Sequence, residues 1–197
     1  MRAVYLKRPI RPPNRLEHNN TLGPEWYSGQ TGLLPVDDAI RTVNDNAYLH
    51  HIMRLMVVGN AMFLCEIEPS QVYRWFMEMF ADSWDWVMVG NVYYMSQWCS
   101  DAITTKPYIS SSAYIARMSD YGPRRSGQRS GQRSPSSPPW TDAWDCLYWN
   151  TIRRLRPLLR RNYRMAAQVS IWDKKSSEEK QDIEKRANRF LRQKSHQ

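Results

Sequence analysis

Cysteine is scarce in this sequence, and its spacing offers no common metal-binding motif. The three cysteines, Cys65, Cys99 and Cys146, lie far apart, and none belongs to a Cys-X-X-Cys pair or a Cys/His ligand pattern. Zinc and iron–sulfur sites therefore have no support in the sequence. An odd number of cysteines without a signal peptide is typical of the reducing cytoplasm, and we expect a cytoplasmic protein.

Long apolar runs and strand patterns are missing as well. The longest apolar run, from Leu55 to Ile67, contains Asn60 and is too short to cross a bilayer, so we expect no membrane partner. The sequence has no alternation of strands with helices and no glycine-rich phosphate loop. Apolar residues recur instead at helical spacing, which predicts an all-α fold.

Aromatic and basic residues are abundant. The chain has 9 tryptophans and 11 tyrosines in 197 residues, which suit a packed core and also stacking on planar cofactors or bases. The net charge is +9, which favours polyanionic partners. Arginines gather between Arg153 and Arg164. This run is either a solvated helix face or a contact surface for nucleic acid, and composition leaves both readings open.

Composition divides the chain into four parts. Residues 1–35 form an irregular leading segment, because prolines interrupt it repeatedly. Residues 36–121 form a helical core. Residues 122–139 are a basic insert of low complexity in which RSGQ is repeated, and we expect it to be disordered. Residues 140–197 return to helices.

Local signals place several helix boundaries. Asn44 to Asn46 should break the first core helix, and Pro69 with Ser70 should begin the next one. Thr141 is the expected N-cap of the first helix after the insert. Residues 176–194 predict a final amphipathic helix with acidic residues in its first turn.

The stretch AYLHHIMRLM places two histidines and an arginine in a mostly apolar helical pattern. Arg54 follows His50 by four residues and His51 by three, so the three side chains should cluster on one surface. A buried arginine needs a partner for its charge, and Asp82 and Asp85 are the available carboxylates. The cluster is either a structural Arg–Asp strut beside two satisfied histidines or the floor of a polar site.

Four segments in order resemble the prokaryotic cryptochrome/photolyase-related family, the branch that includes iron–sulfur (6-4) photolyases and bacterial cryptochromes. They are TGLLPVDDAIRTVNDNAYLHHIMRLMVVGN, DWVMVGNVYYMSQ, TKPYISSSAYIARMSDY and IWDK. The resemblance runs from residue 1 to about 175, apart from the insert. It implies the C-terminal, all-helical part of a photolyase-type FAD-binding domain, in which FAD lies in a bowl of helices and damaged DNA docks over it.

The resemblance implies a flavoprotein whose parent activity is light-driven, FAD-dependent repair of pyrimidine photoproducts in DNA, the reaction of a carbon–carbon lyase. The implied cofactor is FAD and the implied partner is DNA. The alternative is a non-catalytic helical protein that binds nucleic acid through the arginine run and the insert. The type of lesion, and the choice between repair and light signalling, stay open.

The resemblance also implies roles for individual residues. The expected lesion-site residues are His51 as proton donor with Tyr108 and Tyr114 beside it. The expected flavin-side residues are Arg54 and Asp82, which resemble the ion pair next to the flavin ring, and Asn91 in the flavin-side loop. The expected electron-transfer residues are Trp75 and Tyr27, the latter in place of a tryptophan. For the arginine run, the expected nucleic-acid contacts are Arg153, Arg154, Arg160 and Arg161.

Several positions depart from the family pattern. The iron–sulfur cysteines would fall at Pro35, at Gly122 and within the insert, so we predict that no cluster forms. Met88 replaces a glutamate found near the flavin in many relatives and cannot offer a carboxylate. Family members are more than twice as long and begin with an α/β antenna domain. We therefore expect an incomplete chain, inactive alone, that binds FAD poorly unless a separate polypeptide supplies the N-terminal half.

Overall fold

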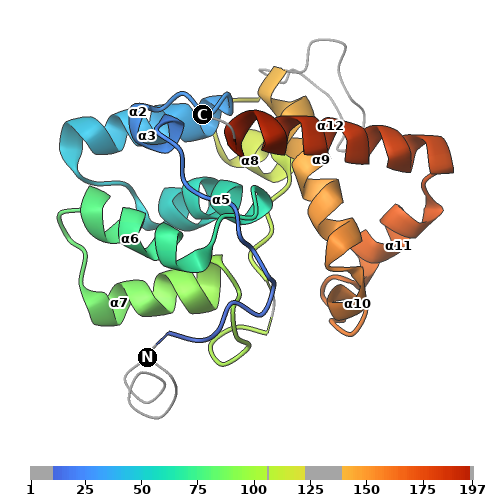
Figure 1. Ribbon diagram of the computed structural model, residues 1–197, viewed down its shortest axis with the longest axis horizontal. Coiled ribbons are helices and arrows are strands. Elements are labelled where there is room, and N and C mark those ends of the chain that lie inside the picture. The colour runs from blue at the N-terminus through green and yellow to red at the C-terminus, as the bar shows by residue number, and fades with distance from the viewer. Residues whose placement is uncertain (1–10, 106, 123–138, 196–197) are drawn as a thin grey trace.

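The computed structural model describes residues 11–105, 107–122 and 139–195, and these form an all-α fold (Figure 1). No strand occurs within these ranges, where the β-type contact is an isolated bridge between Asn20 and Ile67. The predicted fold class is therefore confirmed. None of the helices in the described ranges combines the length and apolar character needed to cross a membrane.

The helices follow one another through short connections. The first described elements are α2 (Glu25–Ser28) and α3 (Leu34–Asn46). A nearly continuous stretch then contains α4 (His51–Met53), the π-helix η1 (Arg54–Gly59) and α5 (Asn60–Leu64). Next come α6 (Pro69–Met79), α7 (Asp85–Val89), the π-helix η2 (Gly90–Ser96) and α8 (Ser112–Met118). The C-terminal helices are α9 (Pro139–Arg154), α10 (Arg156–Leu159), α11 (Ala166–Lys174) and α12 (Ser177–Ser195).

Helix α6 shows how local sequence sets an element. It begins at Pro69, as predicted, because proline has no backbone N–H to lose in the first turn. The carboxylate of Glu68 caps it by accepting from the backbone N–H groups of residues 70 and 71, both at 3.1 Å. Val72, Trp75 and Phe76 recur at helical spacing and are all fully buried, so this face holds α6 against the core.

The turn between α3 and α4 lies where the sequence predicted a break. Helix α3 ends at Asn46, and Ala47 then adopts a left-handed conformation with φ of 50° while its N–H reaches the Val43 carbonyl at 2.7 Å. The Ala47 carbonyl accepts a hydrogen bond from the N–H of Ala81 at 2.9 Å. This hydrogen bond connects the turn before α4 to Ala81, the residue before Asp82. It therefore holds Asp82 close to the start of η1.

The two π-helices pack against each other. The side-chain amide of Gln97 donates to the Gly59 carbonyl at 3.0 Å and to Ser96 Oγ at 2.8 Å. A Cβ on residue 59 would collide with Ser96 Oγ, so the close approach requires glycine there. Single-turn π segments are frequent at functional sites, which draws attention to η1 and η2.

Some boundaries differ from those expected. Helix α9 begins at Pro139, so Thr141 lies inside the helix and is not its N-cap. The first core helix begins at Leu34, and the short helix α2 interrupts the leading segment that was expected to be irregular. Of the insert expected over residues 122–139, positions 123–138 lie outside the described ranges, and Pro139 is the first residue of α9.

Candidate functional site

A buried arginine at the start of η1 pairs with an exposed carboxylate. The Nη1 and Nη2 atoms of Arg54 donate to Asp82 at 2.8 and 2.9 Å, and Nε donates to the Leu49 carbonyl at 2.7 Å. The guanidinium carbon lies 4.1 Å from the ring centroid of Phe80 and 5.0 Å from that of Tyr48. The Arg54 side chain is 7% exposed, whereas that of Asp82 is 52% exposed. The Asp82 carboxylate is therefore open to solvent, and the buried guanidinium of Arg54 holds it in place.

Electrostatics keep that carboxylate charged. The hydrogen bonds from Arg54 hold the pKa of Asp82 below its ordinary value. Three of the five N–H bonds of the guanidinium are donated within the chain, which leaves two for a ligand or for water. The second carboxylate considered from the sequence, Asp85, has other partners: it accepts a hydrogen bond from Tyr73 and lies 3.7 Å from Arg11.

Large apolar side chains near the pair are exposed. Trp84 and Trp86, two and four residues after Asp82, are 66% and 54% exposed, and Tyr48 beside Arg54 is 54% exposed. Aromatic rings usually bury their area, so exposed rings beside a fixed ion pair are informative. Rings, a carboxylate and unused N–H donors together can bind a planar ligand with a polar edge.

The two histidines lie at the start of α4, and both are exposed. His50 is the N-cap, and its Nδ1 accepts from the backbone N–H of Ile52 at 3.3 Å. His51 is the first residue of the helix, and within the described ranges its imidazole has no hydrogen-bond partner. The expected single cluster with Arg54 is wrong in one respect, because Arg54 turns into the core whereas the histidines face solvent.

The segment that carries Tyr108 and Tyr114 is anchored from α5 and α9. The Asn60 side chain donates to the Ser110 carbonyl at 3.3 Å and accepts from the Ser110 N–H at 3.0 Å. The Trp144 indole donates to the same carbonyl at 2.9 Å. Both tyrosines are half-buried. Sequence reasoning did not assign Asn60 this positioning role, although a lone amide in an apolar run was a visible signal.

Trp75 lies in the core and connects to the Arg54 site through a ring. It is fully buried, and its indole N–H donates to the Trp26 carbonyl at 2.9 Å. Its ring packs edge-on against Phe80 with a centroid distance of 5.7 Å. Phe80 in turn lies against the guanidinium of Arg54. The ring of Phe80 thus lies between Trp75 and the Arg54–Asp82 ion pair and contacts both Trp75 and Arg54.

Tyr27 follows Trp26 on α2 and faces outward. Its hydroxyl donates to Glu78 at 3.1 Å, and burial together with this hydrogen bond raises the pKa of Tyr27. Because Trp26 accepts the indole hydrogen bond of Trp75, the two residues expected to transfer electrons lie on neighbouring elements.

The remaining flavin-side positions lie on α7 and η2. Asn91 is half-buried on η2, the π-helix that packs against η1. Met88 is 2% exposed and belongs to the apolar core. A thioether in that core supplies no carboxylate, so Asp82 is the acidic group that the described site offers.

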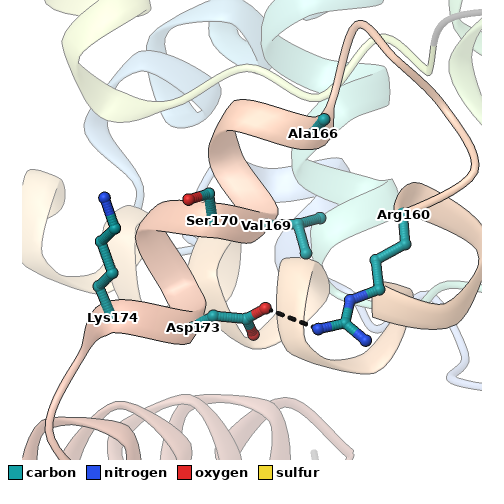
Figure 2. A pocket seen from close by; sticks show the side chains of 6 residues that line it. All are labelled: Arg160, Ala166, Val169, Ser170, Asp173 and Lys174. Carbon is teal, nitrogen blue, oxygen red and sulfur yellow. Dashed lines mark hydrogen bonds and ion pairs between the residues drawn. The ribbon is translucent and has the colours of Figure 1, made fainter.

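The arginine run is largely engaged in ion pairs within the chain. Arg153 pairs with Glu184 at 3.4 Å and Arg154 with Glu66 at 3.1 Å. Arg160 pairs with Asp173 at 2.9 Å across a surface cavity of about 380 Å³ (Figure 2). Asp173 also binds Arg156 at 2.7 Å, and these hydrogen bonds lower the pKa of its carboxyl group.

Arg161 differs from the other three arginines expected to contact nucleic acid. It is exposed and has no ion pair within the described ranges. The run therefore serves mainly to hold α9, α10 and α11 to neighbouring segments, a use that neither reading of the sequence had considered.

Comparison with known proteins adds an independent finding. Residues 6–125 match the family described as the FAD binding domain of DNA photolyase. A (6-4) photolyase of Agrobacterium fabrum is 34% identical over 180 residues, which cover 91% of this chain and 35% of that protein. An uncharacterized protein of Acanthamoeba polyphaga mimivirus is 42% identical over 98 residues, covering 49% of this chain and 69% of that protein. This chain thus spans about a third of the length of the photolyase it matches.

Proposed function

Because the chain belongs to the family of FAD-binding domains of DNA photolyases, we propose that it supplies the flavin- and lesion-facing surface for light-driven repair of pyrimidine photoproducts in DNA. FAD is the cofactor of this family. The observation that carries the proposal is the Arg54–Asp82 pair, which lies within the matched residues and presents an exposed, charged carboxylate beside exposed aromatic rings.

The residues of this site fit the chemistry of a flavin ring. A flavin is planar, and its edge carries both acceptors and an N–H donor. Asp82 can accept from that edge, and the two unused N–H bonds of Arg54 can donate to it. The amide of Asn91 can do either. When bound, FAD would supply the light-driven electron transfer, and the protein would supply binding, orientation and electrostatics.

His51 is the group proposed to handle the proton. It is exposed at the start of α4, one helical turn before Arg54. An imidazole without a hydrogen-bond partner within the described ranges is free to donate to a docked base. Tyr108 and Tyr114, held by the Asn60–Ser110 hydrogen bonds, are proposed to line the same lesion site.

Flavin binding is the direct test of this function. We expect the purified chain to quench flavin fluorescence weakly, with riboflavin and FAD bound at similar affinity, because every proposed contact is to the ring. Asp82→Asn should weaken this binding by about tenfold, the usual effect of losing a charged hydrogen bond. Asp85→Asn is the matched control, since it makes the same charge change three residues away and should leave binding unchanged.

Two outcomes would contradict the assignment. If Asp82→Asn and Asp85→Asn weakened flavin binding equally, the Arg54–Asp82 pair would not be the flavin site. Duplex DNA binding by a chain that quenches no flavin would favour the second candidate function, a non-catalytic helical protein that binds nucleic acid. The net charge of +9 is the observation that keeps this second function open.

Repair should depend on His51 and not on His50. We expect His51→Gln to lower repair of a (6-4) photoproduct by about a hundredfold or more, the usual value of a general acid, with flavin content unchanged. The assay would use this chain together with the remaining portion of the Agrobacterium fabrum photolyase as a separate polypeptide. His50→Gln is the control, because His50 only caps α4. Full repair activity in the His51 variant would remove it from the mechanism.

A further inference from the structure

Helix α12 carries a basic face and lies outside residues 6–125, which match the FAD binding domain of DNA photolyase. Lys185, Arg189 and Arg192 recur at intervals of four and three residues, so they lie on one side of the helix over roughly 10 Å. All three are exposed. With Asn188 and Gln193 they line a groove of about 620 Å³. No carboxylate is among the described residues that line it.

The charge in this groove is not compensated within the described ranges. Arg186, on the same helix, pairs with Asp182 at 3.3 Å. Most of the arginine run is likewise paired, as Arg153 is with Glu184. By contrast, the described residues provide no ion pair to the three cations of the groove. Three exposed cations without an ion pair to the described residues therefore lie together in a hollow, where the other described lining residues are the amides Asn188 and Gln193.

The opposite side of α12 is already occupied. Ala187 is fully buried, and Ile183, Phe190 and Leu191 are half-buried against the apolar core. The helix packs along α9, and Figure 1 shows it at the upper edge of the molecule, away from α7 at the lower edge. A helix that lies in a membrane interface needs a free apolar face, which α12 lacks. Its free side is polar and suits phosphate oxygens.

We propose that the α12 groove, formed by Lys185, Arg189 and Arg192 with Asn188 and Gln193, binds the phosphate backbone of nucleic acid. The contact is independent of base sequence, because charges and amides on one helix face reach phosphates and read no base edge. It lies on a different part of the fold from the Arg54–Asp82 pair and does not depend on flavin, so it goes beyond the function proposed above.

The test is the salt dependence of binding to an undamaged duplex oligonucleotide in the dark. Replacing Lys185, Arg189 and Arg192 together by Gln should reduce the slope of log K against log salt by about 2 to 3 units, because each lost phosphate contact contributes about 0.9. Affinity at low salt should fall by more than about tenfold. Circular dichroism and thermal unfolding would show that the variant stays folded.

A matched triple variant separates the groove from net charge. Arg74→Gln, Arg117→Gln and Lys174→Gln remove the same charge from exposed positions outside α12 and should change the slope by less than about 1 unit. Exchanging Lys for Arg and Arg for Lys at the three groove positions should preserve the slope.

Three results would overturn the proposal. The first is an equal loss in the matched triple variant, which would mean that net charge alone attracts DNA. The second is an unchanged slope in the groove variant, which would leave the groove a solvated face. The third is a defect confined to vesicles of phosphatidylcholine with phosphatidylserine, which would assign the groove to membranes. None of these measurements involves flavin, so the outcome is distinct from failure of the proposed function.

Discussion

Acidification from pH 6.5 to about 3 is expected to cost this chain roughly 4 kcal/mol of folding free energy through His18 alone. His18 has no exposed surface, and its ring packs edge-on against Phe63 at a centroid distance of 5.0 Å. Neither ring nitrogen has a hydrogen-bond partner within the described ranges. Burial first, and then repulsion by Arg154, lowers the pKa of His18 from 6.5 to about 3.

The sign of the effect follows from proton binding. The unfolded chain protonates His18 near pH 6.5, whereas the folded chain resists protonation down to about pH 3. Between these values the unfolded state binds more protons, so stability rises with pH across this window. Above pH 6.5 both states hold a neutral imidazole and His18 adds no further dependence. A fall in pH therefore favours the unfolded state.

Urea unfolding as a function of pH measures this contribution. In the unmodified chain the free energy of unfolding should fall between pH 6.5 and 3 by roughly 4 kcal/mol more than in His18→Phe. His51→Phe, which replaces an exposed histidine, should leave the dependence unchanged. Carboxylates with lowered pKa, such as Asp82 and Asp173, also destabilise the fold in acid, but they are common to all three proteins. Parallel curves for the unmodified chain and His18→Phe would show that His18 is not the group responsible.

Removal of Asp82 is expected to destabilise the fold more than removal of Arg54. Asp82→Ala leaves a buried guanidinium with the Leu49 carbonyl as its remaining acceptor, and should cost about 2 to 3 kcal/mol. This range is below that of a fully buried pair because the Asp82 side chain is half exposed and partly screened by solvent. Arg54→Met keeps the packing on Phe80 and leaves Asp82 hydrated, and should cost about 1 to 2 kcal/mol.

A double-mutant cycle in urea tests this order. The coupling between the two positions should be about 1 kcal/mol or more, because the two side chains share both hydrogen bonds. Asp85→Asn serves again as the control for a change of charge nearby. If Arg54→Met proved more destabilising than Asp82→Ala, this explanation would be wrong. The cost of an unpaired buried guanidinium would then not be the main contribution of the pair to stability.

Much of the architecture was accessible from local pattern. Helical spacing predicted an all-α fold, and Pro69 marked the start of α6. The burial cost of an arginine predicted that Arg54 needs a carboxylate, and two candidates were named in advance. These inferences succeed because a helix buries residues three and four apart, a relation contained in the sequence alone. The role of Asn60 was missed, since its partner Ser110 lies far along the chain.

The sequence narrowed the choice among charged partners, and the tertiary structure settled it. The sequence by itself determined the helical class, the break after Asn46 and the need of Arg54 for an acid. Spacing alone left Asp82 and Asp85 open, and the family resemblance paired Arg54 with Asp82. The tertiary structure contains that pair, because the bond between Ala81 and Ala47 brings Asp82 to η1. It also paired most of the arginine run and left the α12 groove uncompensated. Charge and periodicity are properties of a segment, but pairing depends on where distant helices place their side chains.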